Sequence, residues 1–262
     1  MRRILFGHPK ICIPPETYVL HKCIYYFQVY NHLPWNVLVN LVLATLEYHP
    51  KFTAFNLSLR PLAIELQNTP KNRRSLAYIF DQFYRYYAQE KELQCSLWGD
   101  KTPKNTYHLD KIHNVFPKAK YIHLIRNGAD VVHSYMKSGL RPELHRAAVE
   151  WQKTVKLAQS FGDLHPSQYI EIRYENLVQN PAQITRTICN FLDIQYFEGM
   201  EEQTKGIVSL MGDVQEFEHL SNVENKINTR SIGKGVKTFN EAQINELKHL
   251  IGSTMNELGY EL

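Results

Sequence analysis

Short apolar runs rich in β-branched and aromatic residues alternate along the chain with longer segments whose apolar residues recur every three or four positions. This alternation predicts an α/β fold with a mainly parallel sheet, because parallel strands need a crossover connection between them. The predicted strands are KICIP (10–14), CSLWG (95–99), YIHLIR (121–126) and YIEIRY (169–174). The third run is almost entirely apolar, so we expect a central strand that is buried on both faces.

Helical periodicity is clearest in 73–91 and 142–161, where apolar residues fall on one stripe. The stripe residues are Leu76, Ile79, Phe80, Phe83 and Tyr87 in the first, and Leu144, Ala148, Trp151, Val155 and Ala158 in the second. Thr102 and Pro103 predict a capped helix start, and Asn240 with Gln243 predicts a capping box before a last helix. The most apolar run, 33–48, is too short to span a bilayer and predicts a buried helix.

Composition and charge are those of an ordinary soluble protein. The 262 residues are 44% hydrophobic and 21% charged, with a formal net charge of +4 and no dense basic stripe. This balance suits a small anionic ligand, and we expect no nucleic-acid partner. Without repeats or linkers, residues 1–262 are predicted to form a single domain. The oligomeric state cannot be read from the sequence.

The four cysteines stand apart, at positions 12, 23, 95 and 189, without the spacing of a zinc site or a disulfide framework. We therefore expect no metal. The N-terminus has two Arg but no signal-peptide core, and no transmembrane segment is evident, so a cytoplasmic protein is expected.

Charged residues stand where predicted strands end and helices begin, in WGDKTPKN, LIRNGADVV and IRYENLV. In an open α/β sheet, ligands bind at the carboxyl ends of the strands, where helix N-termini direct N–H groups at anions. At one such end, Arg126 and Ser134 could hold a phosphate through a guanidinium and a hydroxyl. Alternatively, Arg126 forms an ion pair with Asp130, and Ser134 is a small packing residue.

Two further strand ends carry a lysine and a carboxylate. Lys101 could neutralise charge that develops on a bridging oxygen, or it could be a solvated partner of Asp100. Glu16 follows two prolines that fix the backbone, and could act as a general base. The alternative for Glu16 is a place near the first turn of the following helix, where its charge suits the helix dipole.

RSIGKGVK is a basic, glycine-containing segment in which Gly233 and Gly235 would let backbone N–H groups approach a ligand. Arg230, Lys234 and Lys237 surround it with positive charge. It lacks the pattern of a P-loop, and a plain surface turn is the alternative.

Together these motifs resemble the sulfotransferases that use 3′-phosphoadenosine 5′-phosphosulfate (PAPS), in particular the bacterial-type branch related to tyrosylprotein sulfotransferases. The matching stretches run in family order over nearly the whole chain. They are HPKICIPPET, FDQFYRYYAQEKELQCSLWGDKTPKNTYHLDKIHNVFPKAKYIHLIRNGADVVHSYMKSG, YIEIRYENLVQNPAQITRTICNFLDI and NKINTRSIGKGVKTFN. The combination of K-T-P, R-N-G-A-D-V-V-H-S and R-Y-E-N-L-V is specific, whereas each piece alone is not.

The resemblance implies PAPS as co-substrate, 3′,5′-bisphosphoadenosine as product and no metal. It implies Glu16 as catalytic base and Lys101 as the lysine that stabilises the sulfuryl group, with Ser221 also near that group. For the nucleotide it implies Arg126 and Ser134 at the 3′-phosphate, Tyr174 near the adenine nucleotide, and a closing loop over 226–238 with Arg230, Gly233 and Lys234.

The resemblance also implies a three-layer, P-loop-hydrolase-like fold with a mainly parallel central sheet flanked by helices. Two departures stand out. Family members begin with a strand and a loop like G-x-P-R-S-G-T, which this chain lacks, so we expect MRRILFGHP to be the later part of the helix after that loop. Gly235 and Val236 also stand where the family usually has a Trp.

Sulfuryl transfer to a hydroxyl or amine is the leading hypothesis, and the absent loop motivates a second: a nucleotide-binding or interaction protein with weak or no catalysis. A kinase or a metal-dependent glycosyltransferase is a third, disfavoured because no Walker loop and no D-x-D pair occur. We expect the acceptor to bind the helical region 18–92, which is rich in Tyr and Phe. Protein tyrosine, carbohydrate, lipid and small phenol are all open.

Overall fold

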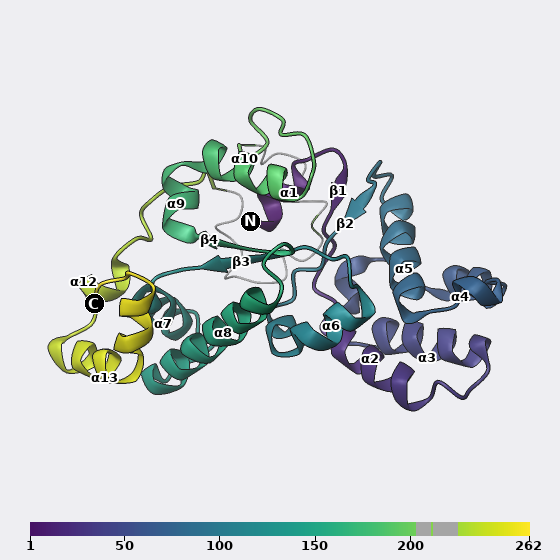
Figure 1. The fold of residues 1–262 in the computed structure, drawn as a ribbon, viewed down its shortest axis with the longest axis horizontal. Coiled ribbons are helices and arrows are strands. Elements are labelled where there is room, and N and C mark those ends of the chain that lie inside the picture. Colours follow the sequence, from purple (N-terminus) through teal and green to yellow (C-terminus); the bar gives the residue numbers. More distant parts are fainter. Residues whose placement is uncertain (203–210, 212–224) are drawn as a thin grey trace. The chain divides into compact units, whose positions relative to one another are not determined.

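The structure is a computed structural model that describes residues 1–202, 211 and 225–262 (Figure 1). The chain divides into two compact units. Unit 1 comprises residues 1–119 and 197–226, and unit 2 comprises residues 120–196 and 227–262. The single-domain organisation of residues 1–262 stays a prediction.

Unit 1 combines one short parallel ladder with six α-helices in its described part. Its elements are α1 (Arg2–Phe6), β1 (Ile11–Cys12), α2 (Leu20–Val29), α3 (Trp35–Glu47), α4 (Arg60–Gln67), α5 (Leu76–Glu90), β2 (Leu97–Trp98) and α6 (Leu109–Val115). Short 3₁₀ helices cover Phe52–Phe55, Lys71–Arg73 and Pro103–His108. Ile11 pairs with Leu97 and Cys12 with Trp98, so the chain leaves both strands in the same direction.

The core of unit 1 is aromatic and confirms the stripe predicted for 73–91. The Ser75 side chain accepts a hydrogen bond from the Tyr78 N–H and starts α5 there. All five stripe residues are buried, and Phe55 packs against Phe83 with ring centroids 5.6 Å apart. Large apolar rings removed from water account for most of the stability of such a core.

The apolar run 33–48 forms α3, a helix with one buried face, as predicted. Its buried residues are Trp35, Leu38, Val39, Val42, Leu43 and Leu46. Within residues 1–202, 211 and 225–262, no helix has the length and apolar character needed to cross a membrane.

Unit 2 contains a longer parallel ladder whose strands are joined through two helices. Its elements are β3 (Tyr121–Ile125), α7 (Gly128–Lys137), α8 (Leu144–Leu164), β4 (Tyr169–Arg173), α9 (Tyr174–Gln179), α10 (Pro181–Phe191), α12 (Lys234–Thr238) and α13 (Glu241–Glu257). The register runs from Tyr121 opposite Tyr169 to Ile125 opposite Arg173. The predicted α/β class with parallel strands is therefore confirmed.

Helices α7, α8 and α13 enclose the core of unit 2, as the yellow and teal helices in Figure 1 show. The predicted stripe of α8 is buried throughout. The predicted capping box is also present: the Asn240 side chain accepts from the Gln243 N–H, and the Gln243 side chain accepts from the Asn240 N–H. This cap satisfies two backbone donors at the start of α13 that would otherwise lack partners.

The expectation that β3 is buried on both faces is wrong. Tyr121 lies on the face that packs against α8, where its ring centroid is 4.6 Å from that of Phe161. Leu124 lies on the opposite face and is 37% exposed. An apolar run becomes fully buried only where layers cover both sides, and the run itself does not reveal how many layers there are.

Candidate functional site

Glu16 and Lys101, the predicted base and the predicted sulfuryl-stabilising lysine, form an ion pair in unit 1. Lys101 Nζ donates to Glu16 Oε1 across a separation of 85 residues. The Glu16 side chain is 13% exposed and that of Lys101 is 41% exposed. Both residues follow the carboxyl ends of β1 and β2, and the parallel pairing of these strands brings the two loops together. Solvent can thus reach the pair mainly through the lysine.

Asp100 binds the two loops to each other and leaves Lys101 free to pair with Glu16. Its Oδ2 accepts hydrogen bonds of 2.6 Å from the hydroxyls of Thr17 and Tyr84, and its Oδ1 accepts one of 3.0 Å from Asn105 Nδ2. The alternative pairing of Lys101 with Asp100 is therefore wrong. Burial, together with the Asp100 charge, raises the pKa of Tyr84 well above its ordinary value.

Thr102 forms a second hydrogen bond between these loops. Its hydroxyl accepts from the Thr17 N–H over 3.1 Å. Thr102 and Pro103 do start a helix, as predicted, with Thr102 at the N-cap position. The Thr102 side chain makes no cap bond, however, and the helix that begins there is the 3₁₀ helix Pro103–His108. The Thr102 hydroxyl thus accepts from the backbone of Thr17, which is distant in the sequence, and not from the N–H groups of the helix that follows Thr102.

Glu16 lies in the irregular segment between β1 and α2, and α2 begins only at Leu20. The alternative that Glu16 lies near the first turn of this helix, where its charge suits the helix dipole, stays a prediction. Two residues further on, Tyr18 has φ = 60°, a left-handed conformation that is costly for a large side chain. Its ring stacks on His49 at 5.2 Å, which helps to hold this segment.

In unit 2, Arg126 lies against Tyr174 and the loop before α12. Its guanidinium is 4.7 Å from the centre of the Tyr174 ring, and Nη2 donates to the Ser231 carbonyl over 2.6 Å. Nη2 is also 3.5 Å from Asp130 Oδ2, so the predicted alternative of an Arg126–Asp130 ion pair is present. Arg126 Nε is buried and has no hydrogen-bond partner among the described residues.

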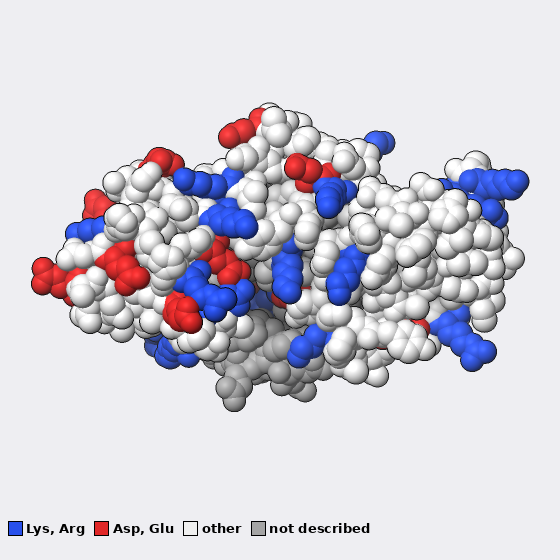
Figure 2. Space-filling model, turned by 90° about the horizontal axis from the view of Figure 1, so that it is seen from below, with Lys and Arg blue, Asp and Glu red and all other residues white. Residues whose placement is uncertain are grey.

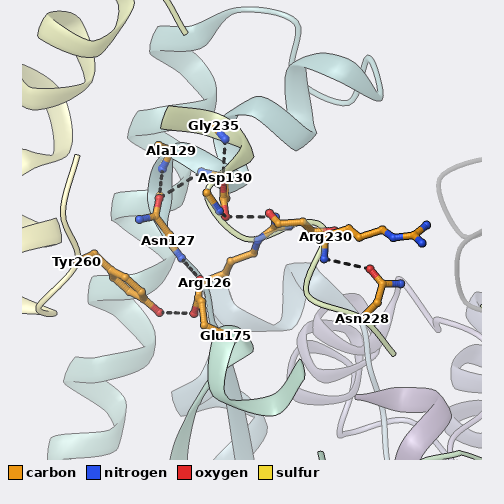
Figure 3. A network of polar contacts seen from close by, with 12 residues as sticks. Arg126, Asn127, Ala129, Asp130, Glu175, Asn228, Arg230, Gly235 and Tyr260 are labelled. Carbon is orange, nitrogen blue, oxygen red and sulfur yellow. Dashed lines mark hydrogen bonds and ion pairs between the residues drawn. The ribbon is translucent and has the colours of Figure 1, made fainter. Parts of the chain in front are cut away.

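The same network fixes the start of α7 (Figure 3). The Asn127 side chain accepts from the N–H groups of Ala129 and Asp130 and caps the helix. The Asn127 N–H donates to Glu175, whose other oxygen accepts from the Tyr260 hydroxyl at 2.9 Å. A pocket of about 500 Å³ opens beside these residues and is also lined by Asp130 and Gly233.

The remaining predicted site residues lie on the surface or outside the described ranges. Ser134 is exposed on α7, and Lys234 is exposed at the first position of α12. The Arg230 side chain points away from the network in Figure 3, while its N–H donates to Asn228. Ser221 lies outside the described residues. The structure therefore brings Glu16 together with Lys101 in unit 1. In unit 2 it brings Arg126 together with Tyr174 and the loop before α12.

A third polar group occupies one face of the β3–β4 ladder. His123 Nδ1 lies 2.6 Å from the Tyr169 hydroxyl and 3.1 Å from Glu171 Oε2. The hydrogen bond from His123 holds the pKa of Glu171 below its ordinary value, and burial raises that of Tyr169. No motif in the sequence pointed to this group, although Tyr169 and Glu171 are two positions apart in a predicted strand and therefore share one face of it.

Helices α2 to α5 make up most of the region predicted to face the acceptor. Tyr25, Tyr30 and Tyr48 are exposed there by 58%, 40% and 85%. On the face seen in Figure 2, this part, at the right, is largely uncharged, and the charged side chains visible on it are mostly Lys and Arg. Exposed tyrosine rings offer flat surfaces for stacking.

Comparison with known proteins places the chain in a family. The model of the Sulfotransferase family matches residues 1–198. The chain belongs to this family.

Two proteins named as candidate protein-tyrosine sulfotransferases are similar to this chain. The one from Caenorhabditis briggsae is 29% identical over 62% of this chain and 60% of its own length, and the one from Caenorhabditis elegans is 29% identical over 66% and 69%. The chain thus spans less than two thirds of the first relative.

Solved sulfotransferase domains share the fold of this family member. The domain from the Synechococcus PCC 7002 olefin synthase aligns with a TM-score of 0.65 and 21% identity, over 100% of this chain and 90% of that domain. The domain from the curacin biosynthetic pathway aligns with a TM-score of 0.60 and 21% identity, over 100% and 93%. The predicted P-loop-like α/β class is thereby confirmed.

Proposed function

We propose that the protein transfers the sulfuryl group of PAPS to a hydroxyl or amine acceptor, with Glu16 as general base. The observation that carries the proposal is the ion pair between Glu16 and Lys101. A carboxylate and an ammonium, fixed at the carboxyl ends of two parallel strands, provide the proton acceptor and the positive charge that this transfer needs.

In the proposed reaction, Glu16 takes the proton of the acceptor hydroxyl while the acceptor oxygen attacks sulfur. An oxygen–sulfur bond forms, and the bond from sulfur to the bridging phosphate oxygen breaks. Lys101 neutralises the charge that gathers on this leaving oxygen, and 3′,5′-bisphosphoadenosine departs. As in phosphoryl transfer, the protein contributes mainly by positioning and by charge stabilisation.

The residues of unit 2 fit a nucleotide phosphate. Arg126 has a buried Nε–H without a partner among the described residues, and an anion would satisfy this donor. Ser134 has an exposed hydroxyl, and Tyr174 presents its ring beside Arg126. We assign Arg126 and Ser134 to the 3′-phosphate, and Tyr174, Arg230, Gly233 and Lys234 to the nucleotide. Ser221 is retained as a further candidate near the sulfuryl group.

The acceptor is proposed to bind α2 to α5. The names of the nematode relatives favour a protein tyrosine among the four candidate classes. Carbohydrate, lipid and small phenol acceptors are the alternatives to test beside it.

Binding of the nucleotide without transfer is the second candidate function. It is favoured by the partners of Arg126, which are Ser231 and Asp130: neither contact involves Glu16 or Lys101, so the proposed nucleotide contacts do not require the proposed catalytic pair. A guanidinium held in this way could bind bisphosphoadenosine while the chain transfers nothing.

The experiment is a transfer assay with sulfur-labelled PAPS against one acceptor of each class, combined with calorimetric titration of bisphosphoadenosine. We expect labelled product, and a decrease in turnover of roughly 10²- to 10⁴-fold for Glu16→Gln. Glu246→Gln, at an exposed position on α13 and outside the proposed acceptor and nucleotide sites, is the matched control and keeps full activity. Binding without transfer supports the second function, near-normal turnover of Glu16→Gln contradicts the assignment of the base, and absence of both binding and transfer contradicts both functions.

A further inference from the structure

Asp130 is a carboxylate in the interior of unit 2 that binds backbone from a distant segment. Its side chain is 0% exposed. Oδ2 accepts from the Gly233 N–H over 2.9 Å, and Oδ1 accepts from the Gly235 N–H over 2.7 Å. Both oxygens are therefore engaged by the segment that begins α12. A buried carboxylate is stable in such a place only when hydrogen bonds replace the lost water.

The two glycines allow this segment to touch α7 through its backbone. A Cβ on Gly235 would lie 2.2 Å from the Ala129 carbonyl oxygen and 2.7 Å from the Asp130 nitrogen, which no side chain tolerates. Gly233 has φ = 71°, and a Cβ there would meet nothing within 4 Å. Gly235 is thus required for the close contact, and Gly233 for the turn that leads into it.

The position of this segment also sets the position of Arg126. The Ser231 carbonyl, two residues before Gly233, accepts from Arg126 Nη2, and Asp130 Oδ2 lies 3.5 Å from the same nitrogen. Asp130 therefore contacts both the loop and the guanidinium, as Figure 3 shows. A change at Asp130 moves both together.

We infer that Asp130 is a positioning residue that holds the 231–235 loop on α7 and thereby sets the affinity for the nucleotide. The inference rests on the proposed function, because it assigns this loop and Arg126 to nucleotide binding. Asp130 itself faces backbone N–H groups and has no part in the chemistry at Glu16 and Lys101. Its loss should weaken nucleotide binding and leave the turnover of the saturated enzyme nearly unchanged.

Three variants of the full chain test this. Asp130→Asn keeps the size of the side chain but turns an NH₂ group toward a backbone N–H. Gly235→Ala pushes the loop away while Asp130 stays intact, and Gly233→Ala strains the same turn more mildly. Gly252→Ala on α13 is the matched control, since its nearest neighbour is a Lys248 side-chain carbon at 4.0 Å.

Calorimetry with bisphosphoadenosine and steady-state kinetics with PAPS are run well below the unfolding temperature of each variant. We expect Asp130→Asn and Gly235→Ala to raise Kd and KM by roughly tenfold or more with little change in kcat. Gly233→Ala should raise them less, and Gly252→Ala should match the wild type. If Asp130→Asn does not fold, the two loop glycine variants still decide the question.

The outcomes distinguish failure of the inference about Asp130 from failure of the proposed function on which it rests. Wild-type protein that binds, with unchanged Kd in the folded loop variants, overturns the inference alone and leaves Asp130 a purely structural residue. Wild-type protein that binds no nucleotide overturns the proposed function, and the inference with it.

Discussion

The hydroxyl of Thr17 donates to the carboxylate of Asp100 over 2.6 Å. These two residues are the immediate neighbours of Glu16 and Lys101 in the chain. The bond between them therefore fixes the distance between the proposed base and its lysine, and the second bond, from the Thr17 N–H to Thr102, fixes the orientation. Thr17 and Asp100 therefore position the proposed catalytic pair, Glu16 and Lys101, without taking part in the proposed reaction themselves.

Thr17→Val tests this arrangement, because it keeps the β-branched shape and removes the hydroxyl. Thr17 is 3% exposed, so loss of a buried bond to a charged group should lower the free energy of unfolding by about 1.5–3 kcal/mol. Displacement of the base should lower kcat by about 10- to 100-fold. Urea denaturation and the labelled transfer assay measure the two effects.

Thr53→Val is the control for Thr17→Val. The Thr53 hydroxyl is exposed and donates to the Pro50 carbonyl over a long 3.5 Å. Its stability should change by less than about 0.5 kcal/mol. A Thr17→Val protein with wild-type kcat would show that the bond to Asp100 does not position Glu16.

Lys101→Met removes the ammonium and keeps most of the side-chain volume. Since Lys101 is 41% exposed, its ion pair should contribute no more than about 1 kcal/mol to stability. Loss of charge stabilisation at the leaving oxygen should lower kcat by roughly 10²- to 10³-fold. Activity should therefore fall far more than stability.

The matched variant is Lys104→Met, three residues along and exposed. It should retain both activity and stability. Equal kcat values for the two variants would remove Lys101 from the proposed mechanism.

Ser134→Ala separates binding from folding. Ser134 is exposed on α7, so its removal should change stability by less than about 0.5 kcal/mol. If its hydroxyl bonds the 3′-phosphate, Kd for bisphosphoadenosine should rise roughly tenfold or more. Ser138→Ala, at the C-terminal end of the same helix, removes a hydroxyl that donates to Tyr135 and should leave Kd unchanged. Equal Kd values in the two variants would contradict the assignment.

Much of the fold could be predicted because the deciding interactions are local. The capping box of Asn240 and Gln243 and the buried stripe of α5 involve residues within a few turns of one another, so their spacing shows them. Thr102 looked like the same kind of signal. Its hydroxyl, however, binds the backbone of Thr17. A partner 85 positions away cannot be recognised from the residues around Thr102.

The site was predictable residue by residue but not as a set of contacts. Glu16 and Lys101 were each recognisable from their neighbours and from the family resemblance, whereas their pairing depends on the register of Ile11 with Leu97. Asp130 was visible only as a partner of Arg126. Its main partners are backbone N–H groups, which every residue except proline carries and which the sequence therefore cannot mark.

The last prediction concerns pH and the group on the β3–β4 ladder. The hydrogen bond from His123 lowers the pKa of Glu171 from its ordinary 4.5, so the folded state favours the carboxylate. This stabilisation is fully present above the pKa of the Glu171 carboxyl in the unfolded chain and is lost as pH falls through its lower pKa in the folded state.

Glu171→Gln should therefore reduce the free energy of unfolding at neutral pH and flatten the fall of this free energy in acid. His123→Phe should shift that fall to higher pH. Urea denaturation across the acid range measures both, with Glu246→Gln, at an exposed position on α13, as control. Wild type and Glu171→Gln with the same acid dependence would show that this carboxylate is not held by His123.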